Sequence, residues 1–210
     1  MSSTYDQQYF QGCGAKGNYS DYVADARGPS EHLAETLFRR FRPASALDVG
    51  CAVGYTTKRL RQFGVEAWGY DISNWAVDTA DVPYIQVFDF ASKWIPAQFD
   101  LVYSYDVVEH IPEQQLEFAV RNMWSACRKD LLIVPALYPE GTTHDPHEPT
   151  HLIFHAREWW LQFFVERCGL PYDPEASDML AAEEHSKVFQ YSDRIFVFSR
   201  FRERIPAATA

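Results

Sequence analysis

LDVGCAVG, residues 47–54, is the stretch of this chain that most directly predicts its fold. It completes a short apolar run, SALDVG, which is typical of a buried strand that stops at a glycine. A segment of helical period, TTKRLRQFG, follows and ends at Gly64. A strand, a glycine turn and a helix in succession indicate an open α/β sheet, in which ligands lie beyond the carboxyl ends of the strands.

On either side of this stretch, apolar runs alternate with segments of helical period. Strands are predicted in VEAWGYDI, YIQVFDF, FDLVYSYDVV and DLLIVPAL, and helices in HLAETLFRRF, SNWAVDTA and PEQQLEFAVRNMWSACR. This alternation predicts an α/β fold with a Rossmann-like, doubly wound sheet that is mostly parallel. Near the end of the chain, VFQY and RIFVFSRF read as a hairpin about Ser192 and Asp193, so the last strand is expected to be antiparallel.

The length of 210 residues predicts a single domain over 1–210. Within it, residues 1–30 are rich in Tyr, Gly, Gln and Ser and are expected to form an N-terminal arm. Residues 138–156 interrupt the strand and helix pattern and contain several Pro and His residues, which indicates a loop. No internal repeat or linker divides the chain.

Composition narrows the classes of partner. The chain has 29 Asp and Glu residues against 19 Lys and Arg residues, a formal net charge of −10, which disfavours nucleic acid and anionic membrane surfaces. No apolar run reaches the length of a membrane span. The four cysteines form no CxxC pair, so neither a zinc knuckle nor a disulfide framework is predicted, and a reduced, cytoplasmic protein is expected.

The glycine turn after the first strand predicts a ligand. Gly50 and Gly54 let a ligand approach the backbone, and the N–H groups at the following helix start favour an anion such as an amino-acid carboxylate. Asp48 is expected to balance the cationic end of the same ligand, directly or through water.

Two further strand ends carry acidic side chains. Asp71, 23 residues after Asp48, suits the two hydroxyls of a ribose. Asp89 suits an exocyclic amine and the Phe90 backbone a ring nitrogen, although an Asp at this position is also a common turn residue. Together these positions describe an adenine, a ribose and an amino acid that lie across three strand ends.

LDVGCAVGYTT, GYDIS and FDLVYSYDVVEHI resemble the successive motifs of class I S-adenosylmethionine-dependent methyltransferases. The resemblance covers residues 45–135 and implies that family's fold, its cofactor and its reaction. It implies that the cofactor contacts are Asp48, Gly50, Cys51, Gly54, Asp71, Ile72, Asp89, Phe90 and Tyr105. The family commonly has Gly at the position of Ala52, so Ala52 is expected to keep an ordinary φ in a slightly altered loop.

Two other functions fit parts of the same pattern. A nucleotide-dependent oxidoreductase on a similar sheet would prefer GxGxxG, whereas Gly50 and Gly54 here are four apart. A catalytically inactive methyltransferase fold that serves as a binding module is the second alternative, and Ala52 is the feature that suggests it. The acidic residues Asp71 and Asp89 favour a working cofactor pocket.

His110 and His151 are the candidate catalytic residues, because an imidazole can accept the proton that a methyl acceptor releases. The sequence Asp106-x-x-Glu109-His110, with Thr150-His151 later, is similar to the ExxEH…TH arrangement of ubiquinone-biosynthesis O-methyltransferases. This resemblance implies a divalent cation at Asp106, Glu109, His110 and His151, with Asp106 replacing a longer Glu. Alternatively, the histidines act without a metal, in catalysis or in a polar network.

The remaining features concern the acceptor. The expected acceptor is a small molecule that is methylated at oxygen or nitrogen in a biosynthetic or tailoring pathway. The protein is expected to be a monomer or a homodimer. The N-terminal arm resembles the tyrosine-rich segments that fold over the cofactor in small methyltransferases. Alternatively, it is a surface arm that only packs on the domain. The helix after the loop 138–156 carries four aromatic residues, Trp159, Trp160, Phe163 and Phe164. They are expected to face the core, and the alternative is that they form an aromatic wall for the substrate.

Overall fold

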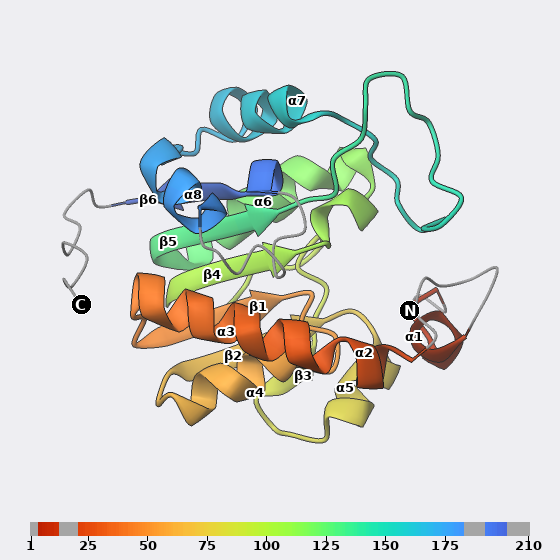
Figure 1. Cartoon of the computed structure of the whole chain (residues 1–210), viewed down its shortest axis with the longest axis vertical. Helices are drawn as coiled ribbons and strands as arrows, with labels where there is room; N and C mark the ends of the chain where they lie inside the picture. Colours follow the sequence, from red (N-terminus) through yellow and green to blue (C-terminus); the bar gives the residue numbers. More distant parts are fainter. Residues whose placement is uncertain (1–3, 13–20, 183–191, 201–210) are drawn as a thin grey trace.

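A six-stranded sheet with helices on both faces organises the chain in the computed structural model, which describes residues 4–12, 21–182 and 192–200 (Figure 1). The strands are β1 (Ser45–Val49), β2 (Glu66–Asp71), β3 (Ile85–Val87), β4 (Phe99–Tyr105), β5 (Cys127–Val134) and β6 (Phe196–Ser199). The α-helices are α1 (Gln7–Gln11), α2 (Tyr22–Asp25), α3 (Arg27–Phe41), α4 (Tyr55–Gln62), α5 (Asn74–Ala80), α6 (Glu113–Ala126), α7 (Arg157–Gln162) and α8 (Pro174–Ala181). Short helical turns are η1 (Val108–His110), η2 (Phe163–Arg167) and η3 (Ser192–Arg194).

The strand order is β3-β2-β1-β4-β5-β6, in which β1 to β5 pair in parallel and β6 pairs with β5 in antiparallel orientation. The predicted sheet is therefore confirmed. The chain leaves β1 toward β2 on one side and later returns to β4 on the other, so a crevice for a ligand is expected between their carboxyl ends. The first strand of the predicted hairpin, VFQY, lies outside the described residues, and Ser192 and Asp193 belong to η3.

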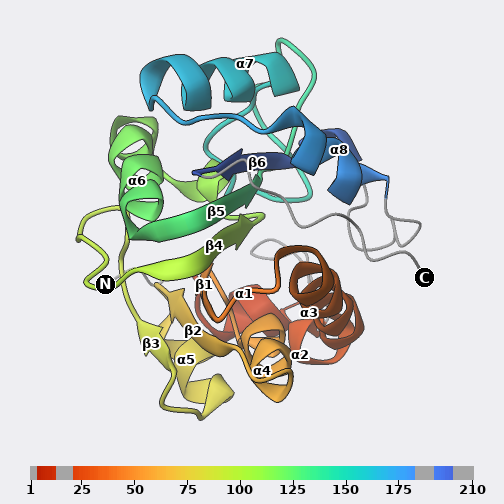
Figure 2. The same cartoon turned by 90° about the vertical axis from the view of Figure 1, so that its left-hand side faces the viewer.

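Helices cover both sides of the sheet (Figure 2), and the strand residues that face each side are buried. Leu47 and Val49 pack with Leu116 and Met123 of α6 on one side. On the other side, helices α3, α4 and α8 contribute Leu37, Leu60 and Leu180 to a second core. Burial on both faces explains why the strands read as continuous apolar runs. None of the helices in the described part of the chain has the length and apolar content that a membrane span requires.

The aromatic residues after the histidine loop belong to the core. Trp160, Phe163 and Phe164 are buried among α6, β5 and β6, while Trp159 is half-buried and stacks on His155 with ring centroids 3.9 Å apart. The core-facing interpretation is correct, because none of these four residues lines either of the two cavities described below. The helical segment continues from α7 into the π-helical turn η2 and ends at Gly169 with φ +72°.

The described part of the N-terminal arm packs on the glycine turn. Tyr9 and Phe10 of α1 are buried against Ala52 and Val53, and the Phe10 ring stacks on Trp75 of α5 at 5.0 Å. The backbone carbonyl of Tyr5 accepts a hydrogen bond from Ser73 Oγ at 2.5 Å. Residues 13–20 of the arm, which include Tyr19, lie outside the described residues. The arm therefore covers the predicted cofactor motif.

Candidate active site

A cavity of about 800 Å³ opens where the carboxyl ends of β1, β2 and β4 meet. Among the predicted cofactor contacts, the residues that line it are Gly50, Asp71, Ile72, Asp89, Phe90 and Tyr105. The arm contributes Thr4, Tyr5, Tyr9 and Phe10 to the lining of the same cavity. The volume lies within the range of pockets that hold small ligands and cofactors.

Asp71 ties the glycine turn to the end of β2. Its Oδ2 accepts a hydrogen bond from the Ala52 N–H at 2.8 Å, and its Oδ1 accepts one from the Ser73 N–H at 2.8 Å. The carboxylate is buried, and burial raises its pKa. Each oxygen keeps a second lone pair, so Asp71 can hold the turn and still accept from a ribose.

The expectation of an ordinary φ at Ala52 is wrong. Ala52 has φ +48°, in the left-handed region that favours glycine. The hydrogen bond to Asp71 and the packing of Tyr9 and Phe10 on the turn hold this conformation. Asp106, which also lines the cavity, has φ +52°, so two of the four non-glycine residues with positive φ in the described chain lie at this site.

Three predicted cofactor contacts are not among the residues that line the cavity. Asp48 is buried and accepts a hydrogen bond from Thr57 Oγ1 at 2.9 Å, and burial raises its pKa to about 7. Cys51 packs in a small apolar cluster with Ala80 and Ile85. Gly54, with φ +71°, begins α4 close to the Ile85 side chain. The contacts of these three residues are with α4, α5 and β3, so in this structure they support the glycine turn.

Asp89 lies at the cavity and also caps a turn. Its carboxylate accepts hydrogen bonds from the Ala91 N–H at 3.1 Å and from Ser92 Oγ at 2.6 Å. Asp89 therefore acts as a turn residue in the structure. It also lines the cavity, so its contact with adenine stays a prediction.

A second cavity of about 880 Å³ adjoins the first. Three residues line both cavities, namely Tyr9, Asp106 and His110. Residues of the loop 138–156 form much of the second cavity, and Tyr138, Asp145, Glu148 and His151 are among them. His110 consequently lies at the junction between a space lined by the predicted cofactor residues and a more polar space.

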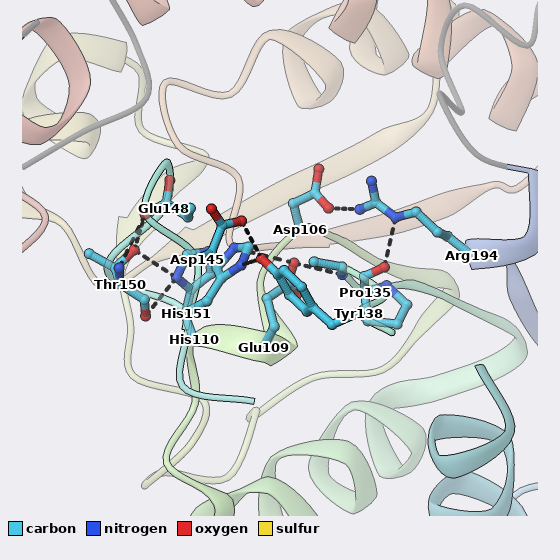
Figure 3. Close-up of polar contacts among 11 residues, drawn as sticks. Asp106, Glu109, His110, Pro135, Tyr138, Asp145, Glu148, Thr150, His151 and Arg194 are labelled. Atoms are coloured by element: carbon cyan, nitrogen blue, oxygen red, sulfur yellow. Dashed lines mark hydrogen bonds and ion pairs between the residues drawn. The ribbon is translucent and has the colours of Figure 1, made fainter. Parts of the chain in front are cut away.

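The structure brings His110 and His151 together with Glu109 (Figure 3). The two imidazole rings have centroids 4.5 Å apart, and potential ligand atoms of the three residues lie within 4.8 Å of one another. His144 and His147 of the same loop are exposed, and His155 lies against Trp159. Only one of the four loop histidines therefore joins the candidate site.

Asp106 pairs with Arg194 and not with Glu109, His110 or His151. It forms an ion pair with Arg194 of η3, and Arg194 Nε donates to the Pro135 carbonyl at 2.7 Å (Figure 3). The resemblance places Asp106 beside Glu109, His110 and His151 in a cation site. The structure does not bring it into that group, so one carboxylate and two imidazoles remain, a donor set that fits a transition-metal ion better than Mg²⁺.

Glu109 fastens the loop to the sheet. Its side chain is fully buried, its Oε1 accepts the Ala136 N–H at 2.8 Å, and its backbone carbonyl accepts from Leu152 and Ile153. Burial raises its pKa to about 7, and Oε2 has no hydrogen-bond partner among the described residues. Burial acts in the opposite direction on the imidazoles and lowers the pKa of His110 to about 3 and of His151 to about 4, so both are neutral at pH 7.

Sequence reasoning missed several polar residues of the second cavity. Tyr138, Asp145 and Glu148 lie in the loop 138–156, whose sequence points to its histidines, and Arg194 begins the predicted strand RIFVFSRF. Glu148 is only 4% exposed, which is unusual for a glutamate in a loop. The dense mixture of acidic and hydroxyl side chains around His151 in the printed sequence was the available signal.

The sheet order, the antiparallel last strand and the cavity at the switch point define a Rossmann-like α/β protein of the class I methyltransferase type. A family model described as a methyltransferase domain matches residues 22–182, and the chain belongs to this family. No curated protein sequence matches the chain.

Solved structures share the fold at low sequence identity. The O-methyltransferase of a Brevibacillus brevis trans-AT polyketide synthase, solved with S-adenosyl-L-homocysteine, is 15% identical, with a TM-score of 0.56 over 80% of this chain and 70% of that one. Magnesium protoporphyrin IX methyltransferase from Synechocystis, with bound S-adenosylmethionine, is 18% identical, with a TM-score of 0.53 over 79% of each chain. The match to Streptomyces venezuelae DesVI (18% identity, TM-score 0.48) covers 57% of this chain and 55% of that one. This chain therefore spans about half the length of that neighbour.

Proposed function

We propose that this chain transfers the methyl group of S-adenosylmethionine to the oxygen or nitrogen of a small molecule in a biosynthetic or tailoring pathway. One observation carries the proposal: Gly50, Asp71 and Asp89, from three strand ends, line one cavity that continues past His110 into a second. Membership of the methyltransferase family and the cofactors bound to its structural neighbours support the same cofactor here.

The two cavities suit the two reactants. S-adenosylmethionine in the first cavity would have its ribose at Asp71, and the acceptor would approach from the second. Methyl transfer is an in-line displacement, so its rate depends on holding the acceptor atom and the methyl group close and aligned. The arm residues Tyr5 and Tyr9, which line the first cavity, would exclude water during transfer.

Binding and turnover test the proposal separately. Calorimetry is expected to show binding of S-adenosylmethionine and S-adenosylhomocysteine but not of NAD(H), which an oxidoreductase would bind. The protein is then incubated with S-adenosylmethionine and a panel of small hydroxyl and amine compounds, and formation of S-adenosylhomocysteine is measured. Tight binding without turnover on any acceptor would favour the inactive binding module. Cytoplasmic location and the monomeric or homodimeric state remain predictions.

The two histidines are expected to act on the acceptor. His110→Asn and His151→Asn should each lower turnover by about 100-fold, the usual scale of a lost general base, with S-adenosylhomocysteine affinity changed by less than about threefold. His144→Asn is the matched control, because His144 is an exposed histidine of the same loop. Full activity in both site variants would contradict the catalytic role of the histidines.

The chemistry is expected to proceed without a divalent cation. Arg194 pairs with Asp106, so only three of the four ligands that the resemblance implies lie together, one carboxylate fewer than that arrangement supplies. Protein dialysed against EDTA should therefore keep its turnover within about twofold of the untreated sample. A loss of activity that Mn²⁺ or Zn²⁺ restores would instead assign Glu109, His110 and His151 as ligands.

A further inference from the structure

Each of the two site histidines ends a chain of a carboxylate, a hydroxyl and an imidazole, and the loop 138–156 supplies both carboxylates and both hydroxyls (Figure 3). We infer that Glu148 with Thr150, and Asp145 with Tyr138, are positioning residues that hold His110 and His151 as Nδ1–H tautomers. Both Nε2 lone pairs are then available to take a proton from the methyl acceptor. The inference deepens the proposed function and rests on it for its catalytic meaning.

The partners of His110 fix its tautomer. His110 Nδ1 lies 3.2 Å from the carbonyl oxygen of Thr150 and 3.0 Å from its Oγ1. A carbonyl oxygen only accepts, so Nδ1 must carry the proton. The Thr150 hydroxyl donates to Glu148 Oε1 and therefore also presents a lone pair to His110. No described residue accepts a hydrogen bond from Nε2, so the geometry favours Nε2 as the unprotonated nitrogen of the ring.

The partners of His151 lead to the same result. The Tyr138 hydroxyl lies 2.8 Å from Asp145 Oδ2 and also contacts His151 Nδ1. The hydrogen bond that the His147 N–H donates to Asp145 holds the pKa of this carboxyl below its usual value, so Asp145 is ionised and only accepts. The single proton of Tyr138 therefore goes to Asp145, and the tyrosine oxygen accepts from His151 Nδ1–H.

The unprotonated nitrogens lie where a proton acceptor is useful. His151 Nε2 is 3.8 Å from Glu109 Oε1, and the ring lines the second cavity. His110 lines both cavities, and its Nε2 has no hydrogen-bond partner within the described ranges. These positions allow either imidazole to face an acceptor that enters from the second cavity.

The reaction then balances with these residues alone. The acceptor oxygen or nitrogen forms a bond to the methyl carbon, the bond from sulfur to that carbon breaks, and the electron pair stays on sulfur as S-adenosylhomocysteine. The acceptor proton moves to an Nε2, while Nδ1–H stays bonded to Thr150 or to Tyr138. The structure therefore favours acceptors that carry an O–H or N–H proton.

Nuclear magnetic resonance of protein labelled with ¹⁵N-histidine tests the tautomers directly. Both residues are expected to show protonated Nδ1 and unprotonated Nε2 in the wild-type protein at pH 7. Tyr138→Phe should convert His151 into a mixture of tautomers, and Thr150→Val should do so partly for His110, because the Thr150 carbonyl remains. Thr150→Ser should restore the wild-type spectrum, and Thr143→Val, an exposed threonine of the same loop, should leave it unchanged.

Turnover and binding complete the test. Tyr138→Phe and Thr150→Val should each lower turnover in proportion to the Nδ1–H tautomer that the variant loses, roughly twofold for an equal mixture, with S-adenosylhomocysteine affinity unchanged. An Nε2–H tautomer of either histidine in the wild-type protein would overturn the inference. Wild-type turnover in both variants would overturn it too. Absence of S-adenosylhomocysteine binding by the wild-type protein would instead refute the proposed function and leave the tautomer result standing.

Discussion

Asp71→Ala is expected to weaken S-adenosylhomocysteine binding by at least about 100-fold. The substitution removes the charged acceptor for the ribose and leaves the N–H groups of Ala52 and Ser73 without their partner. A lost hydrogen bond to a charged group costs about 1.5–3 kcal/mol, and an unsatisfied buried N–H costs about 1–3 kcal/mol. The turn should loosen as well as lose a ligand contact, so the thermal unfolding temperature should also fall.

Two comparisons separate these effects. Asp78→Ala removes an exposed carboxylate from α5, close to Asp71 in the chain, and should leave binding and stability unchanged. The wild-type protein should prefer methylthioadenosine to its 2′,3′-dideoxy analogue, and Asp71→Asn should reduce that preference. Calorimetry that finds equal S-adenosylhomocysteine affinity for the wild type and Asp71→Ala would remove the ribose assignment.

Gly50→Ala should have a comparable effect for a steric reason. Gly50 has φ +79°, where a side chain costs about 1–2 kcal/mol, and an added Cβ would lie 2.3 Å from Val107 Cγ2. Val107 and Gly50 both line the first cavity, so any shift that relieves the overlap changes the cofactor site. Overpacking adds about 1–3 kcal/mol, and the variant should lose measurable S-adenosylhomocysteine binding.

Gly64→Ala is the matched control for this substitution. Gly64 has φ +85°, but no atom lies within 4 Å of the added Cβ. Both variants should therefore lose stability from the backbone conformation, measured by urea unfolding, but only Gly50→Ala should lose the ligand. Equal binding by the two variants would show that the close approach of backbone and cofactor at Gly50 is not required.

Local sequence predicts some residues of the candidate site but not others. Gly50, Asp71 and Asp89 were predictable because each lies at or just after the end of a strand, and parallel strands place their carboxyl ends at one edge of the sheet. The same rule did not reveal that Asp48, Cys51 and Gly54 are not among the residues that line the cavity, because it specifies a position in the chain but not the direction of a side chain. The ion pair between Asp106 and Arg194 joins residues 88 positions apart, which no local pattern indicates.

By itself, the sequence determined the five parallel strands, the helices that connect most of them and the edge of the sheet at which we predict a nucleoside. These features follow from local hydrophobic period and turn residues, which act over a few positions of the chain. Only the tertiary structure decided which of the seven histidines meet, which hydroxyl each one contacts and how Ala52 adopts its left-handed φ. Those outcomes depend on hydrogen bonds and packing between distant segments, and such contacts exist only once the sheet, the arm and the loop have come together.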